Sequence, residues 1–312
     1  MLEVKNLTKQ YGEKVVVDNL NFSINEPGVY ALLGTNGAGK TTSIRMILGM
    51  LAKNSGEVLW NGKPFSAAQM NVGYLAEERG LYPKYSLLDQ LLYFASLKKV
   101  PKKVAMERIK YWAERLQVEE YVFPPKTAKG KNAKANRADQ LSKGNQQKMQ
   151  LMAALISEPE FLILDEPLSG LDPVNTDLFK GIIREEIAKN KYLIMSSHQM
   201  PTIEEFCTDI TIMNRGQAVL QGNLNAIKKS YGRVNLFVKS DSDIAPYIQK
   251  FGIQIAEKLP SEYHLKVNNE LQAREFLAAM MQENVPLVKF ELREPSLHEI
   301  FVEKVGDNNE ER

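Results

Sequence analysis

The stretch LLGTNGAGKTTSIRM, residues 32–46, constrains the fold more than any other part of this chain. An apolar run, VYALLG, leads into it as a buried strand would, and SIRMILGM carries apolar residues at helical spacing. Between them, Gly34, Gly39, Lys40 and Thr41 satisfy the pattern G-x-x-x-x-G-K-[ST]. A glycine-rich turn between a strand and a helix points backbone N–H groups and the positive end of the helix at an anion. The sequence therefore predicts a phosphate-binding loop in an α/β fold.

The residue types in this loop assign roles to its side chains. Lys40 is expected to reach the β- and γ-phosphates of a nucleotide, and the Thr41 hydroxyl to hold Mg²⁺. The alternative, a glycine turn beside a surface lysine, does not explain why a strand precedes the loop and a helix follows it. The residues expected to contact the nucleotide here are Asn36, Gly37, Ala38, Gly39, Lys40, Thr41 and Thr42.

Acidic residues follow a second apolar run, FLILDEP, where Asp165 and Glu166 emerge at the carboxyl end of a predicted strand. Asp165 is predicted to orient Mg²⁺, and Glu166 to polarise an attacking water as general base. A third run, YLIMSSH, ends on His198, which is predicted to contact the γ-phosphate or to steady Glu166. Taken singly, the acidic pair is also typical of a loop cap and the histidine of a surface residue.

Bulk properties exclude several classes of protein. The 312 residues contain 40 Lys and Arg against 38 Asp and Glu, so no excess of positive charge indicates a nucleic-acid partner. No apolar run approaches the roughly 18 to 20 residues that span a bilayer, and the start, MLEVKNLTK, lacks the apolar core of a signal peptide. The single cysteine, Cys207, fits a reducing compartment. We expect a cytosolic protein.

The order of apolar patterns predicts two domains, residues 1–222 and 223–312. The first begins with short strands and contains a helical subdomain at about residues 80–158, in which Ser86 and Asp89 form a capping-box-like helix start. The lysine-rich stretch 126–137 is interpreted as a solvated loop, with a lipid- or partner-contacting patch as the alternative. FLILDEP, a helical stretch and YLIMSSH predict a parallel βαβ unit. The apolar patterns of the second domain predict the element order βαββαβ, which is typical of ferredoxin-like domains.

Two further motifs complete a family pattern: LSKGNQQ, from Leu141, lies upstream of Asp165, and SGLDP directly follows the acidic strand. With the phosphate loop and His198 in the same order, residues 1 to about 222 resemble the ATP-binding cassette (ABC) ATPases. The resemblance implies an α/β P-loop cassette with a mixed sheet core, a helical subdomain and an N-terminal antiparallel β part. The small α+β ferredoxin-like domain follows it.

The resemblance also implies site residues and a dimer. Tyr11 is similar to the aromatic that stacks on adenine, and Ser142 and Gly144 to signature residues that bind a γ-phosphate. Asn145 is expected to cap the helix that follows. In this family the signature faces a nucleotide held by another copy, with Asp172 across the same interface. Two chains in a head-to-tail arrangement would bury two ATP molecules with Mg²⁺, and hydrolysis would loosen them.

The chain departs from the commonest family pattern at two places. The signature reads LSKGN where LSGGQ is commonest, and Glu77 stands where a loop usually holds a glutamine. The serine and second glycine of the signature remain, so we expect function to persist. We expect the Glu77 carboxylate to approach Mg²⁺ or the attacking water, and its charge to alter how nucleotide state is reported to a partner.

Three functions follow from these motifs. The EERGLYP loop, the signature and the tail domain together resemble the ATPases of bacterial two-component exporters, in which a separate membrane permease docks short helices beside residues 77–95. That resemblance implies a peripheral protein on the inner face of the cell membrane. A soluble ABC ATPase acting on ribosomes or DNA is the first alternative, and a regulatory subunit that binds ATP without turnover is the second. Glu166 and His198 argue against the last.

Overall fold

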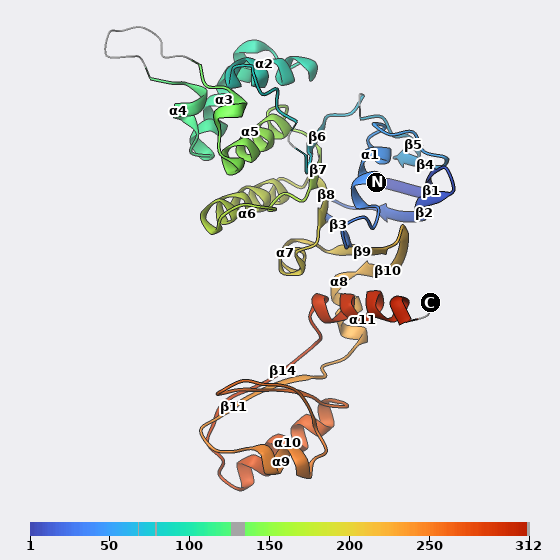
Figure 1. Cartoon of the computed structure of the whole chain (residues 1–312), viewed down its shortest axis with the longest axis vertical. Coiled ribbons are helices and arrows are strands. Elements are labelled where there is room, and N and C mark those ends of the chain that lie inside the picture. The colour runs from blue at the N-terminus through green and yellow to red at the C-terminus, as the bar shows by residue number, and fades with distance from the viewer. Residues whose placement is uncertain (68, 79, 126–134, 311–312) are drawn as a thin grey trace. The chain divides into compact units, whose positions relative to one another are not determined.

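The computed structural model describes residues 1–67, 69–78, 80–125 and 135–310. Internal contacts divide the chain into two compact units, Met1–Gln221 and Gly222–Arg312 (Figure 1). Residues 126–134 of the lysine-rich stretch lie outside the described residues, so its interpretation as a solvated loop stays a prediction. Among the described helices, none combines the length and the apolar character needed to cross a membrane.

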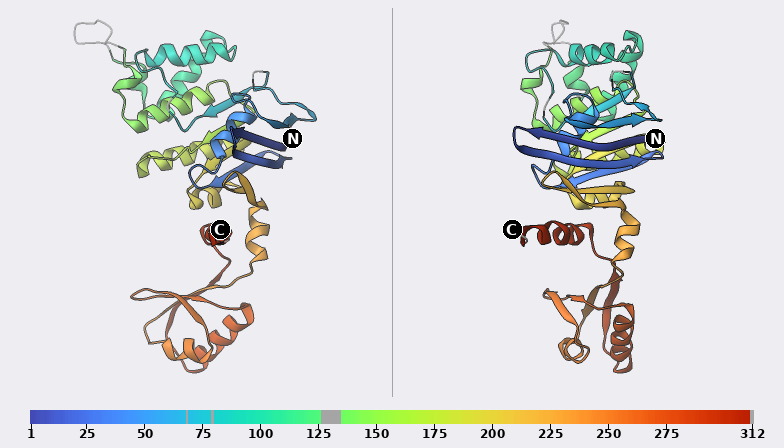
Figure 2. Two further views of the ribbon diagram at one scale, coloured as in Figure 1. Left: turned by 45° about the vertical axis from the view of Figure 1, so that its right-hand side comes forward. Right: turned by 90° about the vertical axis from the view of Figure 1, so that its right-hand side faces the viewer.

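A four-stranded antiparallel sheet, in the order β2-β1-β4-β5, opens the first unit. Figure 2 shows its two long strands, β1 and β2, running side by side. The side chains of Leu2 and Val4 are buried and alternate with the less buried Glu3 and Lys5, as a strand with one face on a core requires. The strands are β1 (Leu2–Tyr11), β2 (Lys14–Ile24), β4 (Ser55–Trp60) and β5 (Lys63–Pro64).

The central sheet has six strands in the order β10-β9-β3-β8-β7-β6, and the pairings of β3 with β8 and β9, and of β7 with β6 and β8, are parallel. Strands β7 and β8 confirm the predicted parallel βαβ unit. Their near-continuous apolar runs fit a sheet buried on both faces. The strands are β3 (Gly28–Gly34), β6 (Val72–Leu75), β7 (Phe161–Asp165), β8 (Tyr192–Ser197), β9 (Asp209–Asn214) and β10 (Gln217–Asn223).

Helices pack on this sheet and connect its strands. Helix α1 (Lys40–Ile47) begins directly after the glycine-rich loop, and its residues Ile44, Met46 and Ile47 are buried in the main apolar core. That core also takes buried residues from both sheets, among them Leu7, Leu32 and Phe161. Helix α6 (Pro173–Ala188) connects β7 to β8, and α7 (Met200–Phe206) connects β8 to β9.

The helical subdomain projects from the same unit (Figure 1). Ser86 caps α2, because its hydroxyl accepts a hydrogen bond from the Asp89 N–H at 3.3 Å; this confirms the predicted helix start. The expected cap at Asn145 is wrong: Ser142 is the N-cap of α5 and accepts from the Asn145 N–H at 3.3 Å. The helices are α2 (Leu87–Leu97), α3 (Lys102–Arg115), α4 (Glu119–Val122), the 3₁₀ turn η1 (Ala138–Gln140) and α5 (Lys143–Leu155).

The second unit contains a four-stranded sheet in the order β12-β13-β11-β14, and each neighbouring pair is antiparallel. Helices α9 and α10 pack on one face, where Leu236, Leu265 and Phe276 belong to a separate apolar core (Figure 2). This βαββαβ arrangement confirms the ferredoxin-like prediction. The elements are α8 (Leu224–Ser230), β11 (Asn235–Ser240), α9 (Ala245–Lys250), β12 (Gln254–Lys258), β13 (Tyr263–Lys266), α10 (Glu270–Gln282), β14 (Leu287–Arg293) and α11 (Leu297–Glu310).

Candidate functional site

The glycine-rich loop wraps around the amine of Lys40. The Lys40 Nζ donates to the carbonyl oxygens of Gly34 and Thr35 at 2.8 and 3.3 Å, and the side chain is buried. Gly39 adopts φ +106°, and a Cβ there would lie 2.7 Å from the carbonyl oxygen of Val16. Only glycine fits this position, so the tight turn that ends at the start of α1 depends on it.

A cavity of about 400 Å³ opens over this loop. Its lining is mostly polar and includes carboxylates from two other segments. The lining residues are Val16, Asn36, Gly37, Ala38, Gly39, Lys40, Thr41, Thr42, Glu77 and Glu166. All seven loop residues predicted from the sequence to contact a nucleotide therefore share one cavity.

Two acids stand at the end of β7 beside this cavity. Parallel pairing places Asp165 opposite Ser196 of β8. The Ser196 hydroxyl donates to Asp165 Oδ1 and accepts from the Glu166 N–H at 3.1 Å. The other oxygen of Asp165, Oδ2, is buried without a hydrogen-bond partner in the described part of the chain. One serine thus orients both acids and leaves a carboxylate oxygen free for a further ligand.

Glu166 lies between a lysine and a histidine. Its Oε2 is 2.9 Å from the Nδ1 of His198, and its Oε1 is 3.7 Å from the Nζ of Lys40. The backbone of Glu166 is left-handed, with φ +50°, which is uncommon for a residue with a side chain. The carboxylate is buried, whereas half of the His198 side chain is exposed. A buried carboxylate at such a bend is typical of a functional position.

The pKa of the Asp165 carboxyl depends on its burial and on the groups around it. Burial raises the pKa of its carboxyl, and the nearby charge of Glu77 raises it further, while the hydrogen bond from Ser196 and the charge of Lys40 oppose the rise. The Thr41 hydroxyl donates to Glu77 Oε2 at 3.5 Å. Thr41, Glu77 and Asp165, the three predicted metal ligands, therefore converge beside the loop. Two carboxylates and a hydroxyl form an all-oxygen donor set, which suits Mg²⁺.

The remaining predicted site residues lie elsewhere. Tyr11 is 53% exposed at the end of β1, and Lys9 Nζ stands 4.7 Å from its ring centre. Ser142 begins α5, with Gly144 and Asn145 in its first turn. Asp172 caps α6 by accepting from the Asn175 N–H at 2.9 Å. None of these five belongs to the described lining of the loop cavity.

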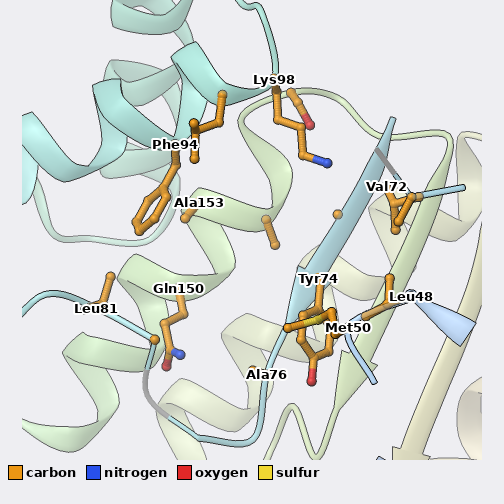
Figure 3. A pocket seen from close by; sticks show the side chains of 16 residues that line it. Leu48, Met50, Val72, Tyr74, Ala76, Leu81, Phe94, Lys98, Gln150 and Ala153 are labelled. Carbon is orange, nitrogen blue, oxygen red and sulfur yellow. The ribbon is translucent and has the colours of Figure 1, made fainter. Parts of the chain in front are cut away.

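A second cavity, of about 460 Å³, separates the helical subdomain from the central sheet (Figure 3). Phe94 reaches it from α2 and Lys98 from the C-cap position directly after α2. Gln150 and Ala153 reach it from α5, while Tyr74 lies across from them on β6. We call this cavity the groove. Burial raises the pKa of the Tyr74 hydroxyl to about 12. The groove adjoins the segment that carries Glu77, because Gln150 Nε2 donates to the carbonyl oxygen of Glu78 at 3.1 Å.

Sequence reasoning missed three residues that hold the site. Ser196 orients both acids, while Gln150 and Arg45 hold the segment after Glu77; the Arg45 guanidinium lies 3.4 Å from the Glu78 carboxylate. Ser196 sits two positions before His198, so a hydroxyl at the same strand end was a usable signal. The contacts of Gln150 and Arg45 join segments far apart in sequence, and no local pattern indicates them.

Comparison with known proteins decides the family. Residues 17–169 match the ABC transporter family. The uncharacterized ABC transporter ATP-binding protein YhaQ of Bacillus subtilis is 41% identical over 307 residues, which cover 98% of this chain and 99% of YhaQ. The chain belongs to the ABC transporter ATP-binding proteins. The bacitracin transport ATP-binding protein BcrA of Bacillus licheniformis is 28% identical over 314 residues, covering 98% and 97%.

Further matches agree with this ABC assignment. Residues 222–305 match the C-terminal domain of DrrA1-3-like ATP-binding proteins, so the second unit also has relatives among ATP-binding proteins. A solved ATP-binding subunit of an ABC transporter superposes with a TM-score of 0.64 at 26% identity and covers 74% of this chain and 93% of that chain. The α/β cassette predicted from the motifs is thereby confirmed. ABC ATPases bind ATP, and Mg²⁺ is generally required.

Proposed function

We propose that this chain is the ATP-hydrolysing subunit of an ABC exporter, and that two copies close around two Mg-ATP to drive a separate membrane permease. One observation carries the proposal. The buried carboxylate of Glu166 lies between Lys40 and His198 at the edge of the loop cavity. A carboxylate held by a histidine beside a phosphate-binding lysine is the arrangement that activates a water for phosphoryl transfer.

The cavity residues fit a magnesium nucleotide. Backbone N–H groups of the loop and the Lys40 amine supply positive character for phosphates. The free buried oxygen of Asp165, with Thr41 and Glu77, supplies the ligands for a hard cation. Bound Mg²⁺ would neutralise charge on the β- and γ-phosphates. Its presence would also remove the cost of burying Asp165 beside a second carboxylate.

Hydrolysis would depend on three side chains of this chain. Glu166 would accept a proton from the attacking water, because its Oε2 is already oriented by His198 at 2.9 Å. His198, half exposed, would keep that carboxylate aimed and reach the γ-phosphate. Lys40 would leave its two loop carbonyl partners and bind the phosphates.

The second copy would complete each site. Ser142 and Asp172 sit at the starts of α5 and α6, outside the loop cavity, and Gly144 and Asn145 lie in the first turn of α5. A helix start offers free N–H groups and the positive end of the dipole to an anion. In an isologous dimer the start of α5 in one copy would meet the γ-phosphate held by the other. Tyr11, exposed at the end of β1, would stack on adenine.

A membrane permease is the partner that the groove supports. The groove is lined mostly by apolar side chains and adjoins the segment that carries Glu77, so an occupant would affect the metal ligands through Gln150 and Glu78. Such grooves receive amphipathic helices. The similarity to the Nod factor export ATP-binding protein I of Burkholderia orbicola, 29% identical over 235 residues, supports the export direction. The chain would then act at the inner face of the cell membrane.

The substitution Glu166→Gln tests the catalytic assignment. The amide keeps the size of the side chain but accepts no proton, so we expect hydrolysis to fall by about 100-fold or more while ATP binding persists. Unhydrolysed ATP should hold the two copies together, which light scattering after size exclusion would record as a dimer. Glu160→Gln, an exposed position just before β7, is the matched control. Hydrolysis at the parental rate in Glu166→Gln would exclude Glu166 as the base.

A further inference from the structure

The side chains of Tyr82, Tyr85 and Tyr93 line an open cavity on the helical subdomain, which we call the bowl. The ring centres of Tyr85 and Tyr93 lie 5.8 and 6.3 Å from that of Tyr82, with interplanar angles of 68° and 65°. Tyr82 is thus the floor, and the other two rings stand steeply to it. Their exposed fractions are 47% for Tyr82, 65% for Tyr85 and 48% for Tyr93. Rings that served only as core packing would be buried.

A buried glutamine fixes the shape of this bowl. Gln90, only 3% exposed, accepts from the Tyr82 N–H at 2.7 Å and donates to the carbonyl oxygens of Tyr82 and Tyr85, both at 3.0 Å. The loop is tied a second time, because the Asp139 N–H donates to the carbonyl oxygen of Pro83 at 3.2 Å. Because the backbone at Tyr82 and Tyr85 is already held, a ligand that binds there costs little backbone conformational entropy.

A carboxylate completes the bowl. Asp89 and Tyr93 are four residues apart on α2 and share one face of that helix. Together with Tyr82, Tyr85 and Gln90 they line a cavity of about 470 Å³. Among the described residues, no lysine, arginine or histidine forms an ion pair with Asp89. The bowl thus offers the exposed surfaces of three tyrosines and one carboxylate without a described counterion.

We propose that Tyr82, Tyr85, Tyr93 and Asp89 form an aromatic cage for one arginine or lysine side chain of a protein partner. The faces of tyrosine rings attract cations, and a nearby carboxylate adds to the attraction. The cage adjoins the groove: Tyr82 stacks on Phe94 at 6.1 Å, and Phe94 lines the groove. A helix lying in the groove places a basic side chain in the cage, and in this respect the inference rests on the proposed permease partner.

An anionic lipid surface is a less suitable occupant. Tyrosines do gather at membrane interfaces, where the accompanying charges are basic. Here the charge inside the cavity is the carboxylate of Asp89, which repels anionic headgroups. The cage therefore selects for a cation.

The cage is tested on the full chain, without nucleotide or permease. Protein labelled at its tyrosine rings is titrated with N-acetyl-arginine methylamide, and ring shifts are followed by nuclear magnetic resonance. The matched ligand is the citrulline derivative, which has the same shape without the charge. Tyr85→Phe and Tyr93→Phe assign the ring signals and keep the π faces. We expect saturable shifts with arginine, and at least about fivefold weaker binding of citrulline.

Two substitutions sharpen the result. Asp89→Asn and Tyr93→Leu should each weaken arginine binding by about fivefold, whereas Tyr93→Phe and the exposed control Asp241→Asn should not. Equal binding of arginine and citrulline, or no shift at the three rings, overturns the proposal. Binding of phosphatidylglycerol vesicles that depends on Tyr93 overturns it in favour of lipid. The titration contains no permease, so its result does not depend on whether the proposed permease partner is correct. Failure of the cage and failure of the proposed function are therefore distinguishable.

Discussion

The Nδ1 of His198 lies 2.9 Å from the Oε2 of Glu166, although the two residues are 32 positions apart. Parallel pairing of β7 and β8 produces this contact, because it brings the carboxyl ends of both strands to one edge of the sheet. The contact fixes a carboxylate whose other oxygen faces Lys40. Its loss is therefore expected to affect chemistry more than binding.

Substituting His198 by alanine tests that expectation. Without the imidazole, Glu166 loses its orienting partner, so hydrolysis should fall by about 100-fold while ATP affinity changes by less than about threefold. Steady-state hydrolysis and calorimetric binding measure the two effects. The matched control is His264→Ala, which removes a histidine paired with Glu257 at 3.0 Å in the second unit. A comparable loss of ATP affinity would show that His198 serves binding instead.

Glu77→Gln tests whether a carboxylate at this position contributes to the metal site. The change removes one negative charge beside Thr41 and Asp165, so the affinity for Mn²⁺, used as a spectroscopic substitute for Mg²⁺, should fall about three- to tenfold in the presence of nucleotide. Electron paramagnetic resonance measures free Mn²⁺ directly. The control is Glu160→Gln, an exposed carboxylate just before β7 that lines neither the loop cavity nor the groove. Unchanged Mn²⁺ affinity would remove Glu77 from the metal site.

The groove is tested by filling it. Ala153→Trp places an indole where Figure 3 shows Ala153 facing the groove, so co-purification of a multi-spanning membrane protein should fall at least about tenfold. ATP affinity should be unchanged, because Ala153 does not line the loop cavity. The control is Ala188→Trp on an exposed position of α6. Recovery of ribosomes in place of a membrane protein would support the soluble alternative.

Local patterns predicted much of this architecture. The apolar runs before Gly34 and Asp165 are buried strands, and Ser86 starts α2 as its spacing with Asp89 indicated. The cap of α5 was assigned incorrectly to Asn145, since Ser142 already satisfies the free N–H group there. Capping depends on which residue leaves helical geometry first, and the sequence alone does not decide this between two polar candidates three positions apart.

The parts that were not predicted depend on contacts between distant segments. Ser196 meets Asp165 through strand register, which the order of strands along the chain does not reveal. The groove combines β6, α2 and α5, and its volume depends on how these elements pack. Sequence reasoning therefore indicated the loop and the acids that lie together in the structure, and missed the residues that position them.

The second unit offers a test by pH. Although burial of Glu299 opposes its ionisation, hydrogen bonds from Lys266, Ser296 and Asn235 outweigh that effect and lower its pKa from 4.5 to about 2. Because the folded pKa lies below the unfolded one, the stabilisation is fully present above about pH 4.5 and is lost as pH falls toward 2. Amide exchange in β11 should accelerate across this window, after correction for intrinsic rates.

Glu299→Gln should remove part of that pH dependence. The side chain is 38% exposed, so solvent screening limits the expected loss of stability to about 1 kcal/mol at neutral pH. Exchange in the full chain measures it, and Glu270→Gln, an exposed carboxylate on α10, is the control. An identical pH profile in Glu299→Gln and the parent would show that another group titrates.

The central claim is that each nucleotide is enclosed by two copies of this chain. The most direct measurement is a crystal structure of the Glu166→Gln variant with Mg-ATP. The account predicts a two-fold dimer in which Ser142 of one copy lies about 3 Å from a γ-phosphate oxygen bound by Lys40 of the other. A structure in which ATP occupies the loop cavity while Ser142 is remote from every γ-phosphate would contradict it.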